Sequence, residues 1–360
     1  MALQKAFSNF SRCCLSFPGL SRSPWNWQGS LRTLYSSESL GLDGYEKKRT
    51  MTRTQFGGLE QQFKDKMKDV AFGDTKNMIF TEDLKNIVHL AEGEPADHTL
   101  VLQMLKKFNQ QNKHLRFGNF IFGPVVMRMY HFLNEPTQAL AAFKDEELDG
   151  FFDQIVSMQI LGNLLYRNGM YQDVLGVLEV AKVKQVHGYK YPRNVTVLAL
   201  ASCWKMNSVE SYEYALQVLS DLKTVGLEAN LRGITYVAAL ALQQNAPSVA
   251  LEILSLVRNS SYYTVRNLKI AAFVDLSRPD DAFPVLREAM ERSENPASDK
   301  KPSICKDVLE KLAAAVDRLG NKEISLEFEK IQKAISEVQL ISNEVSLNVF
   351  SLKIRNTRKN

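Results

Sequence analysis

The chain has 360 residues, 45% of them hydrophobic, which is ample for a buried core but long for one ordinary compact domain. Its longest apolar run, residues 234–242, falls short of the roughly 20 residues that cross a membrane, so no membrane span is expected. The formal net charge is +5, but four of the 45 basic residues and none of the 40 acidic residues lie in residues 1–36. The remainder is nearly neutral, so overall charge gives no argument for nucleic-acid binding.

Residues 1–36 differ in composition from the rest of the chain. They contain Lys5, Arg12, Arg22 and Arg32, many serines and no acidic residue. This composition is typical of a mitochondrial transit peptide, and no continuous apolar segment of the secretory kind follows Lys5. We therefore expect a protein of the mitochondrial matrix that loses residues 1–36, with cleavage near residues 32–36. A disordered N-terminus without a targeting role is the alternative.

A short helical pattern recurs between residues 139 and 286. Its copies begin at Ala139, Val174, Ala215, Ala250 and Ala282, at spacings of 35, 41, 35 and 32 residues. A period in this range predicts a solenoid of helical hairpins. Proline suits the first turn of a helix, so the prolines three residues before three of the copies mark helix starts; they are Pro136, Pro247 and Pro279.

The predicted fold is therefore all-α, an α-solenoid forming a right-handed superhelix of about seven helix-turn-helix pairs. Turns are expected where each helix ends, at residues 168–169, 207–208 and 245–246. The repeat domain is expected over residues 76–340, after a poorly structured linker at 37–75 and before a basic tail at 341–360. The expected pairs are 81–110, 120–146, 155–186, 194–226, 232–259, 264–293 and 303–338.

The segment ALQVLSDLKTVGLEAN, residues 215–230, resembles the second half of a pentatricopeptide repeat. The tetratricopeptide pattern that begins W-x2-L-G-x2-Y is not found. The segments FGPVVMR (122–128) and GFFDQIVSMQIL (150–161) extend the resemblance to about residues 60–340. The resemblance implies a mitochondrial protein needed for RNA maturation and hence for the respiratory chain. Its implied partners are single-stranded mitochondrial RNA and mitochondrial RNA-processing proteins.

In this family the first helices of successive pairs line a concave face, where RNA is read at one base per repeat. The resemblance places base-reading positions at Gln159, Val197 and Thr235, and one repeat earlier at Pro124. Valine and proline side chains form no hydrogen bond with a base, so the code is incomplete. Each intact contact is worth about 1–3 kcal/mol, which predicts only modest discrimination between sequences.

The resemblance also assigns a polar residue that closes the repeat and basic residues that hold phosphates. The closing position is Asn230, whereas Pro192 stands there one repeat before. The basic positions are Arg167 and Lys205, followed by Gln243. The expected RNA-binding residues are therefore Gln159, Arg167, Lys205, Asn230 and Thr235. Each also has an ordinary interpretation, as a solvated helix residue or as a cation favoured at a helix C-terminus.

No catalytic or metal-binding pattern emerges from the sequence. The acidic run at residues 145–149 ends a helix and is read as a solvated face, and neither Cys203 nor Cys305 has metal-ligand spacing. About 20 residues follow the last expected pair, too few for the metal-dependent domain of organellar nucleases of this family. We expect a non-catalytic RNA-binding adaptor with no cofactor and no metal. The alternative is a protein-binding scaffold of the same shape.

Overall fold

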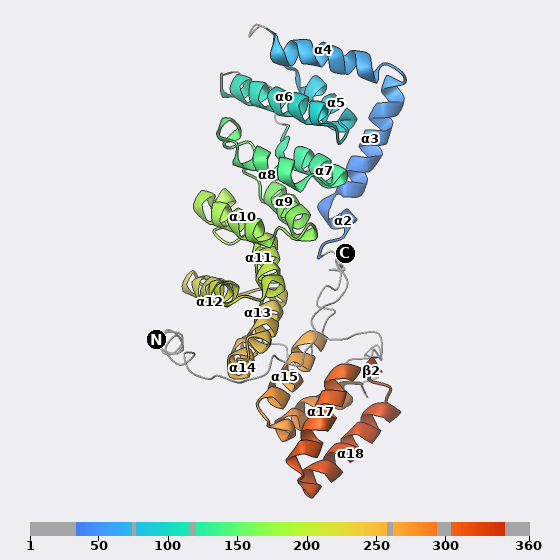
Figure 1. Cartoon of the computed structure of the whole chain (residues 1–360), viewed down its shortest axis with the longest axis vertical. Coiled ribbons are helices and arrows are strands. Elements are labelled where there is room, and N and C mark those ends of the chain that lie inside the picture. The colour runs from blue at the N-terminus through green and yellow to red at the C-terminus, as the bar shows by residue number, and fades with distance from the viewer. Residues whose placement is uncertain (1–33, 74–76, 115–119, 258–261, 294–303, 343–360) are drawn as a thin grey trace.

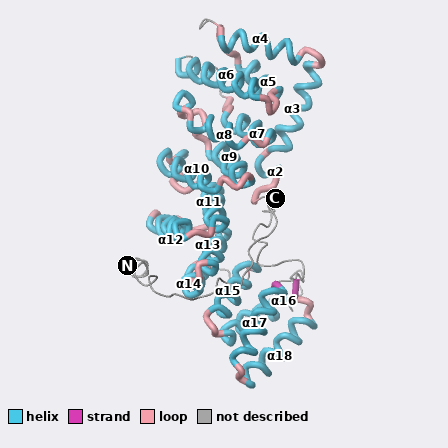
Figure 2. Tube along the Cα trace, viewed as in Figure 1, coloured by secondary structure: helices cyan, strands magenta, loops and turns pink. Residues whose placement is uncertain are grey.

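A computed structural model describes residues 34–73, 77–114, 120–257, 262–293 and 304–342. Helices make up nearly all of these segments, which confirms the all-α prediction (Figure 2). The strands in the described segments, β1 (Ile304–Cys305) and β2 (Ile341–Ser342), form one short parallel pair near the C-terminal end. Nearly all of the predicted transit peptide and basic tail lies outside the described residues.

The described residues contain the seven predicted helical pairs. We call the members of each pair the first helix and the second helix. The bounds agree with prediction to within a few residues. The pairs are α5 (Thr81–Leu90) and α6 (Pro95–His114), α7 (Gly123–Leu133) and α8 (Pro136–Lys144), α9 (Ile155–Arg167) and α10 (Tyr171–Lys184), α11 (Arg193–Met206) and α12 (Val209–Thr224), α13 (Leu231–Gln243) and α14 (Pro247–Ser255), α15 (Tyr263–Asp275) and α16 (Phe283–Ser293), and α17 (Lys306–Leu319) and α18 (Lys322–Glu337). Short 3-10 segments accompany them at η1 (Glu146–Leu148), η2 (Val186–Gly188) and η3 (Pro279–Ala282).

Local sequence signals place the helix boundaries. Pro136 and Pro247 are the first residues of second helices, where a missing N–H removes no intrahelical bond. Asn207 ends α11 in the left-handed conformation with φ +48°, and Asn245 adopts φ +54° at the next turn. Ser208 then begins α12 in a capping box with Ser211. The predicted turns are therefore confirmed.

The first helices form the inner layer of the array. From α7 to α17, each first helix contacts the first helix of the next pair, while the second helices α6, α8, α10 and α12 lie along one side (Figure 1). Small residues allow the close approach of paired helices, since Ala139, Ala215, Ala250 and Ala282 are fully buried. The central first helices are enclosed on all sides, because α9, α11 and α13 each bury an unbroken segment. These segments are residues 157–166, 195–204 and 233–242.

The prediction of a poorly structured linker at 37–75 is wrong. Residues 37–72 form α2 (Ser37–Leu40), α3 (Leu42–Phe56) and α4 (Glu60–Phe72). The segment looks like a linker because it has few apolar residues. It is held instead by buried polar side chains such as Arg49 and Lys64, whose Nζ lies 2.6 Å from Asp97 Oδ2. Residues 37–72 are therefore helical without a periodic apolar stripe, because contacts with distant parts of the chain stabilise these helices.

Residues 34–56 form a segment that we call the N-terminal arm. It runs beside the first helices of the early pairs, with α3 against α5 and α7 and α2 against α9 (Figure 1). Its start is part of the core, since Leu34 is 0% exposed and Tyr35 is 4% exposed. The removal of a presequence stays a prediction, but a boundary at residue 36 would take away two packed residues. No helix of the described segments has the length and apolar content to traverse a bilayer.

Candidate nucleic-acid interface

Two predicted base-reading residues, Gln159 and Thr235, occupy equivalent positions in α9 and α13. Gln159 is 9% exposed, and its Oε1 accepts a hydrogen bond of 3.0 Å from Asn194 Nδ2 on the next first helix. Thr235 is 3% exposed, and its Oγ1 donates to the carbonyl of Arg232 at 2.9 Å. Both side chains therefore bond within the protein, so contact with a base would require these bonds to be exchanged.

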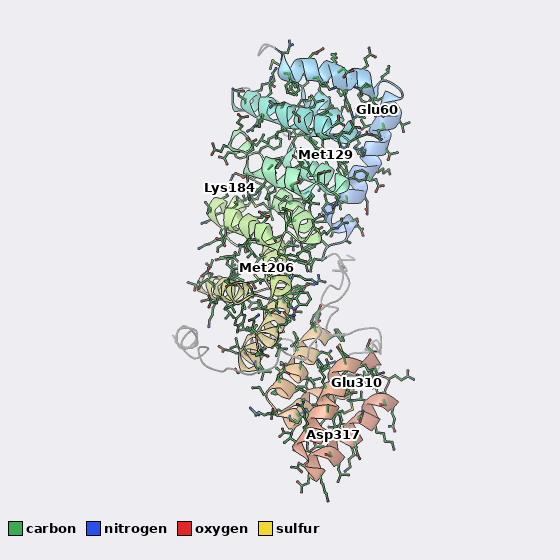
Figure 3. All side chains as sticks on the ribbon, viewed as in Figure 1. Glu60, Met129, Lys184, Met206, Glu310 and Asp317 are labelled. Carbon is green, nitrogen blue, oxygen red and sulfur yellow. The ribbon has the colours of Figure 1, made fainter. Side chains whose placement is uncertain are left out.

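The predicted phosphate-binding residues lie at the opposite ends of the first helices. Arg167 is exposed at the end of α9, and Lys205 lies one residue before the end of α11, next to Met206, which Figure 3 labels. Lys205 Nζ lies 4.7 Å from the centroid of the Trp204 ring, and burial lowers the pKa of the ammonium group. Both positions also suit a helix C-terminus, where the macrodipole favours cations. They do not meet Gln159 or Thr235 in one site.

Asn230, the predicted closing residue, is the N-cap of α13. Its side chain makes no capping bond, and its Oδ1 instead accepts a long hydrogen bond of 3.3 Å from Arg193 Nη2. Asn230 is half-buried, whereas Arg193 is exposed. The structure therefore brings Asn230 together with an arginine from the preceding pair.

Sequence reasoning missed two arginines, Arg193 and Arg232, in the first turns of α11 and α13. Neither first turn contains an acidic residue. Arg232 is half-buried, and its Nη1 atom is enclosed without a hydrogen-bond partner in the described structure. A signal was available in the sequence, because the macrodipole disfavours cations at helix N-termini. Arginines there in two successive repeats indicate a requirement other than helix stability.

The tip of the N-terminal arm reaches this same region. Tyr35 donates its hydroxyl hydrogen to the carbonyl of Asn194 at 3.1 Å, and the Asn194 side chain bonds Gln159. Burial raises the pKa of Tyr35, and the charges of Arg232 and Arg193 oppose that rise. Because Asn194 contacts both the arm and Gln159, the arm lies on the face where the resemblance placed the RNA.

The body of the arm is fastened at the ends of α5 and α7. Arg49 is 7% exposed, and its Nη1 donates to the carbonyls of His89 (2.9 Å) and Ala91 at the end of α5. Its guanidinium carbon lies 5.1 Å from the centroid of the Phe132 ring. A cation is well placed here, because helix C-termini carry unsatisfied carbonyls and partial negative charge.

A second fastening joins the arm to α7. Arg128 Nε donates to the carbonyl of Leu40 at 2.8 Å. The next residue, Gly41, adopts φ +69°, and a Cβ there would lie 3.0 Å from Arg128 Nη2. Glycine therefore permits both the turn between α2 and α3 and the close approach of the arginine. Together these contacts close the inner face of the first three pairs.

The acidic run at residues 145–149 is used in ion pairs between neighbouring pairs. Lys106 Nζ lies 2.8 Å from Asp145 and 3.0 Å from Glu147. Lys184, labelled in Figure 3, lies 2.7 Å from Asp149 and 2.6 Å from Asp153. Within the described segments, no group of three or more His, Cys, Asp or Glu side chains is arranged to hold a metal ion.

The stacked helical pairs define a helical-repeat protein of the α-solenoid class. No protein-family model matches the chain. Over 262 residues, or 72% of the chain, it is 28% identical to "Pentatricopeptide repeat-containing protein 2, mitochondrial" of Xenopus laevis, covering 66% of that protein. The human protein of the same name is 27% identical over 265 residues, 73% of this chain and 66% of its own length. The Danio rerio protein is 27% identical over 283 residues, 78% of this chain and 71% of its own length.

These similarities support a family-level assignment of the chain to the pentatricopeptide repeat proteins, and the sequence-based resemblance is confirmed at that level. The matched segment spans about two thirds of the length of these curated relatives. The relatives are named as mitochondrial, which supports a mitochondrial location for this chain.

Proposed function

We propose that this chain is a non-catalytic adaptor that binds single-stranded RNA in the mitochondrial matrix. It would support maturation of mitochondrial transcripts, and thereby the respiratory chain, by presenting RNA to processing proteins. Pentatricopeptide repeat proteins are generally non-catalytic RNA-binding proteins, and the relatives carry that name. The observation that carries the proposal is the stack of first helices, in which each first helix contacts the first helix of the next repeat. The bond between Gln159 and Asn194 is an example of this contact.

The positions of the predicted RNA-binding side chains favour RNA binding with little preference for particular bases. Gln159 and Thr235 face internal partners, so base reading through them contributes little unless they turn outward. Arg167, Lys205 and Asn230 are more accessible and can contact phosphate or sugar. Phosphate contacts position a strand without reading its sequence, and they weaken as salt rises.

Crosslinking in intact mitochondria, followed by sequencing of the bound RNA, tests the proposal. The control is an unrelated matrix protein carrying the same presequence and the same tag. We expect enrichment of particular mitochondrial transcripts over this control. Equal recovery from both samples would reject RNA binding as the function.

The second candidate function is a protein-binding scaffold. It is favoured by the N-terminal arm, which covers the inner face of the early pairs, and by the near-neutral charge of residues 37–360. A scaffold predicts that native complexes survive RNase treatment. It also predicts that alanine at Gln159, Asn230 and Thr235 leaves co-purification of protein partners unchanged, whereas an RNA adaptor would lose RNA-dependent partners after RNase.

A further inference from the structure

We infer that aromatic side chains in the loops before successive first helices form a stacking surface for the bases of single-stranded RNA. We call these side chains the aromatic row. The inference rests on the proposed function and names the side chains that hold the strand. It differs from the positions that the family resemblance supplied, since no member of the row is among them. The members are Phe80, Phe120, Phe151, Tyr189 and Tyr262.

The first observation is that the row follows the repeat. Each member lies one to four residues before a first helix, and from α5 to α15 only α13 lacks an aromatic residue there, with Leu227 in its place. Positions 80, 120, 151, 189, 227 and 262 are separated by 40, 31, 38, 38 and 35 residues. The spacing matches the period of the helical pairs, so the array presents about one such side chain per repeat.

The second observation is exposure. Phe80, Phe120, Tyr189 and Tyr262 are exposed and Phe151 is half-buried, whereas the central segments of α9, α11 and α13 are buried throughout. Exposed aromatic rings that recur at one place in the repeat indicate an interaction surface. A strand that cannot reach the buried middle of these helices can reach the loops that precede them.

Buried aromatic neighbours hold two members of the row in place. Phe122 is buried, and its ring centroid lies 4.6 Å from that of Phe120 in an edge-to-face arrangement. Tyr191 is buried two residues after Tyr189, and its hydroxyl donates to Asp221 Oδ2 at 2.7 Å. Each of these loops therefore has one aromatic ring packed in the protein and one facing solvent. A ring that is fixed in this way loses little conformational entropy when a base stacks on it.

The third observation is that these loops lie along one edge of the array. Lys85 Nζ of α5 lies 4.4 Å from the centroid of the Phe120 ring. A Cβ on Gly123, at the start of α7, would lie 2.9 Å from the carbonyl oxygen of Phe151. The hydrogen bonds described above join the start of α9 to that of α11, and the start of α11 to that of α13. Since α13 also contacts α15, one strand can run past the whole row.

The charge around the row favours a nucleic acid as the occupant. Residues 180–209 contain five lysine or arginine residues and no acidic residue, and Lys190 directly follows Tyr189. The acidic residues on either side of Phe151 are neutralised by Lys184 through the ion pairs described above. Aromatic rings beside positive charge are the combination that binds single-stranded nucleic acid, because bases stack on the rings while cations attract phosphates. Such stacking is tolerant of sequence, since every base has a π-face.

The test is fluorescence anisotropy of the full chain with a labelled oligouridine 20-mer and with an abasic 20-mer of the same sugar-phosphate backbone. The variants are Phe120→Ala and Tyr189→Ala. We expect each variant to bind oligouridine about 5-fold or more weakly, as expected for one lost base–aromatic stack. Binding of the abasic strand should be weak in all chains and unchanged by the substitutions. The slope of log affinity against log salt should also stay the same, because no phosphate contact is removed.

The matched control is Phe72→Ala at the end of α4, outside the row. Phe72 and Tyr189 are both 57% exposed, so the control removes a ring of equal exposure and should bind oligouridine like the unmodified chain. Tyr189→Trp keeps an aromatic ring and should retain the affinity that Tyr189→Ala loses. A general effect of surface truncation on folding would not follow this pattern.

Alanine variants that bind oligouridine with unchanged affinity would overturn the inference while leaving RNA binding intact. Equal binding of the abasic strand and oligouridine by the unmodified chain would do the same. Alanine variants that keep their RNA affinity but lose protein partners from RNase-treated mitochondria would assign the row to a protein and so overturn the inference. Failure of the unmodified chain to bind oligouridine and mitochondrial RNA would reject the proposed function, and the inference with it.

Discussion

The early and later pairs of this solenoid share one hairpin design but differ in what lies against their first helices. The first helices α5, α7 and α9 are covered by the N-terminal arm, which is held by buried polar bonds from Arg49 and Tyr45. The later first helices α11 and α13 begin with Arg193 and Arg232, beside the tip of the arm. The segment that precedes the repeats therefore covers the early first helices, and its tip reaches the start of α11.

Removing the tip of the N-terminal arm should lower the stability of the protein more than the substitutions described below. A chain that begins at Ser37 lacks Leu34 and Tyr35, which are 0% and 4% exposed. Full burial of one large apolar side chain contributes about 1.5–3 kcal/mol. We expect the free energy of unfolding to fall by about 4 kcal/mol relative to a chain that begins at Leu34, measured by urea denaturation. Equal stability of the two chains would show that the tip is not part of the fold.

Arg49→Met should give the next largest effect, because it leaves two carbonyls at the end of α5 without a donor. Hydrogen bonds that involve a charged group contribute about 1.5–3 kcal/mol, so we expect a loss of about 3 kcal/mol by the same method. Lys47→Met, at an exposed position of the same helix, is the control and should change little. Comparable losses for both variants would contradict the proposed fastening.

Acidification should loosen the early pairs selectively. Burial lowers the pKa of His89, and the nearby charges of Lys48 and Arg49 lower it further. Burial also lowers the pKa of His131, opposed by its 2.9 Å hydrogen bond with Asn163. Unfolded chains take up protons more readily at these sites, so their contribution to stability is present above about pH 6.5 and lost as the pH falls below it.

Hydrogen exchange measured at pH 7.5 and pH 5.5, corrected for intrinsic rates, would locate this effect. We expect α3, α5 and α7 to lose protection at pH 5.5, while α11 and α13 keep theirs. His89→Asn combined with His131→Gln should remove most of the pH dependence. A uniform loss over all helices would place the acid-sensitive groups elsewhere.

Tyr35→Phe should have the smallest effect. It removes only the hydroxyl that bonds the Asn194 carbonyl, and a single neutral hydrogen bond contributes about 0.5–1.5 kcal/mol. We expect the free energy of unfolding, measured by urea denaturation, to fall by about 1 kcal/mol. A free energy of unfolding equal to that of the unmodified chain would show that this bond does not help to hold the arm.

The repeats could be predicted from the sequence because their signals are local. Pro136 and Pro247 begin helices, and Asn207 and Asn245 end them, through backbone preferences that each residue expresses on its own. The N-terminal arm could not be predicted, because its stability depends on Arg49 reaching a helix end about 40 residues away. From the sequence alone, polar residues in a segment with few apolar residues are expected to be exposed to solvent. Only the structure shows that Arg49 is buried against a helix end far along the chain.

The candidate site was predictable only in part. The inward bond of Gln159 depends on Asn194, a residue of the next repeat, so sequence position alone could not reveal its burial. Asn230 was found, but its contact with Arg193 was not. The two arginines were readable, since a cation in a first helical turn opposes the macrodipole. They were missed because the family pattern directs attention to other positions.

The bond between Tyr35 and Asn194 joins residues 159 positions apart, in an array built largely from contacts between adjacent hairpins. Hairpins of neighbouring helices form quickly, whereas closing a long loop is entropically slow. The tip of the arm therefore stays undocked until α11 has folded. Docking of the N-terminal arm becomes a late step of folding, and it connects the hairpins of α5, α7 and α9 through one further segment.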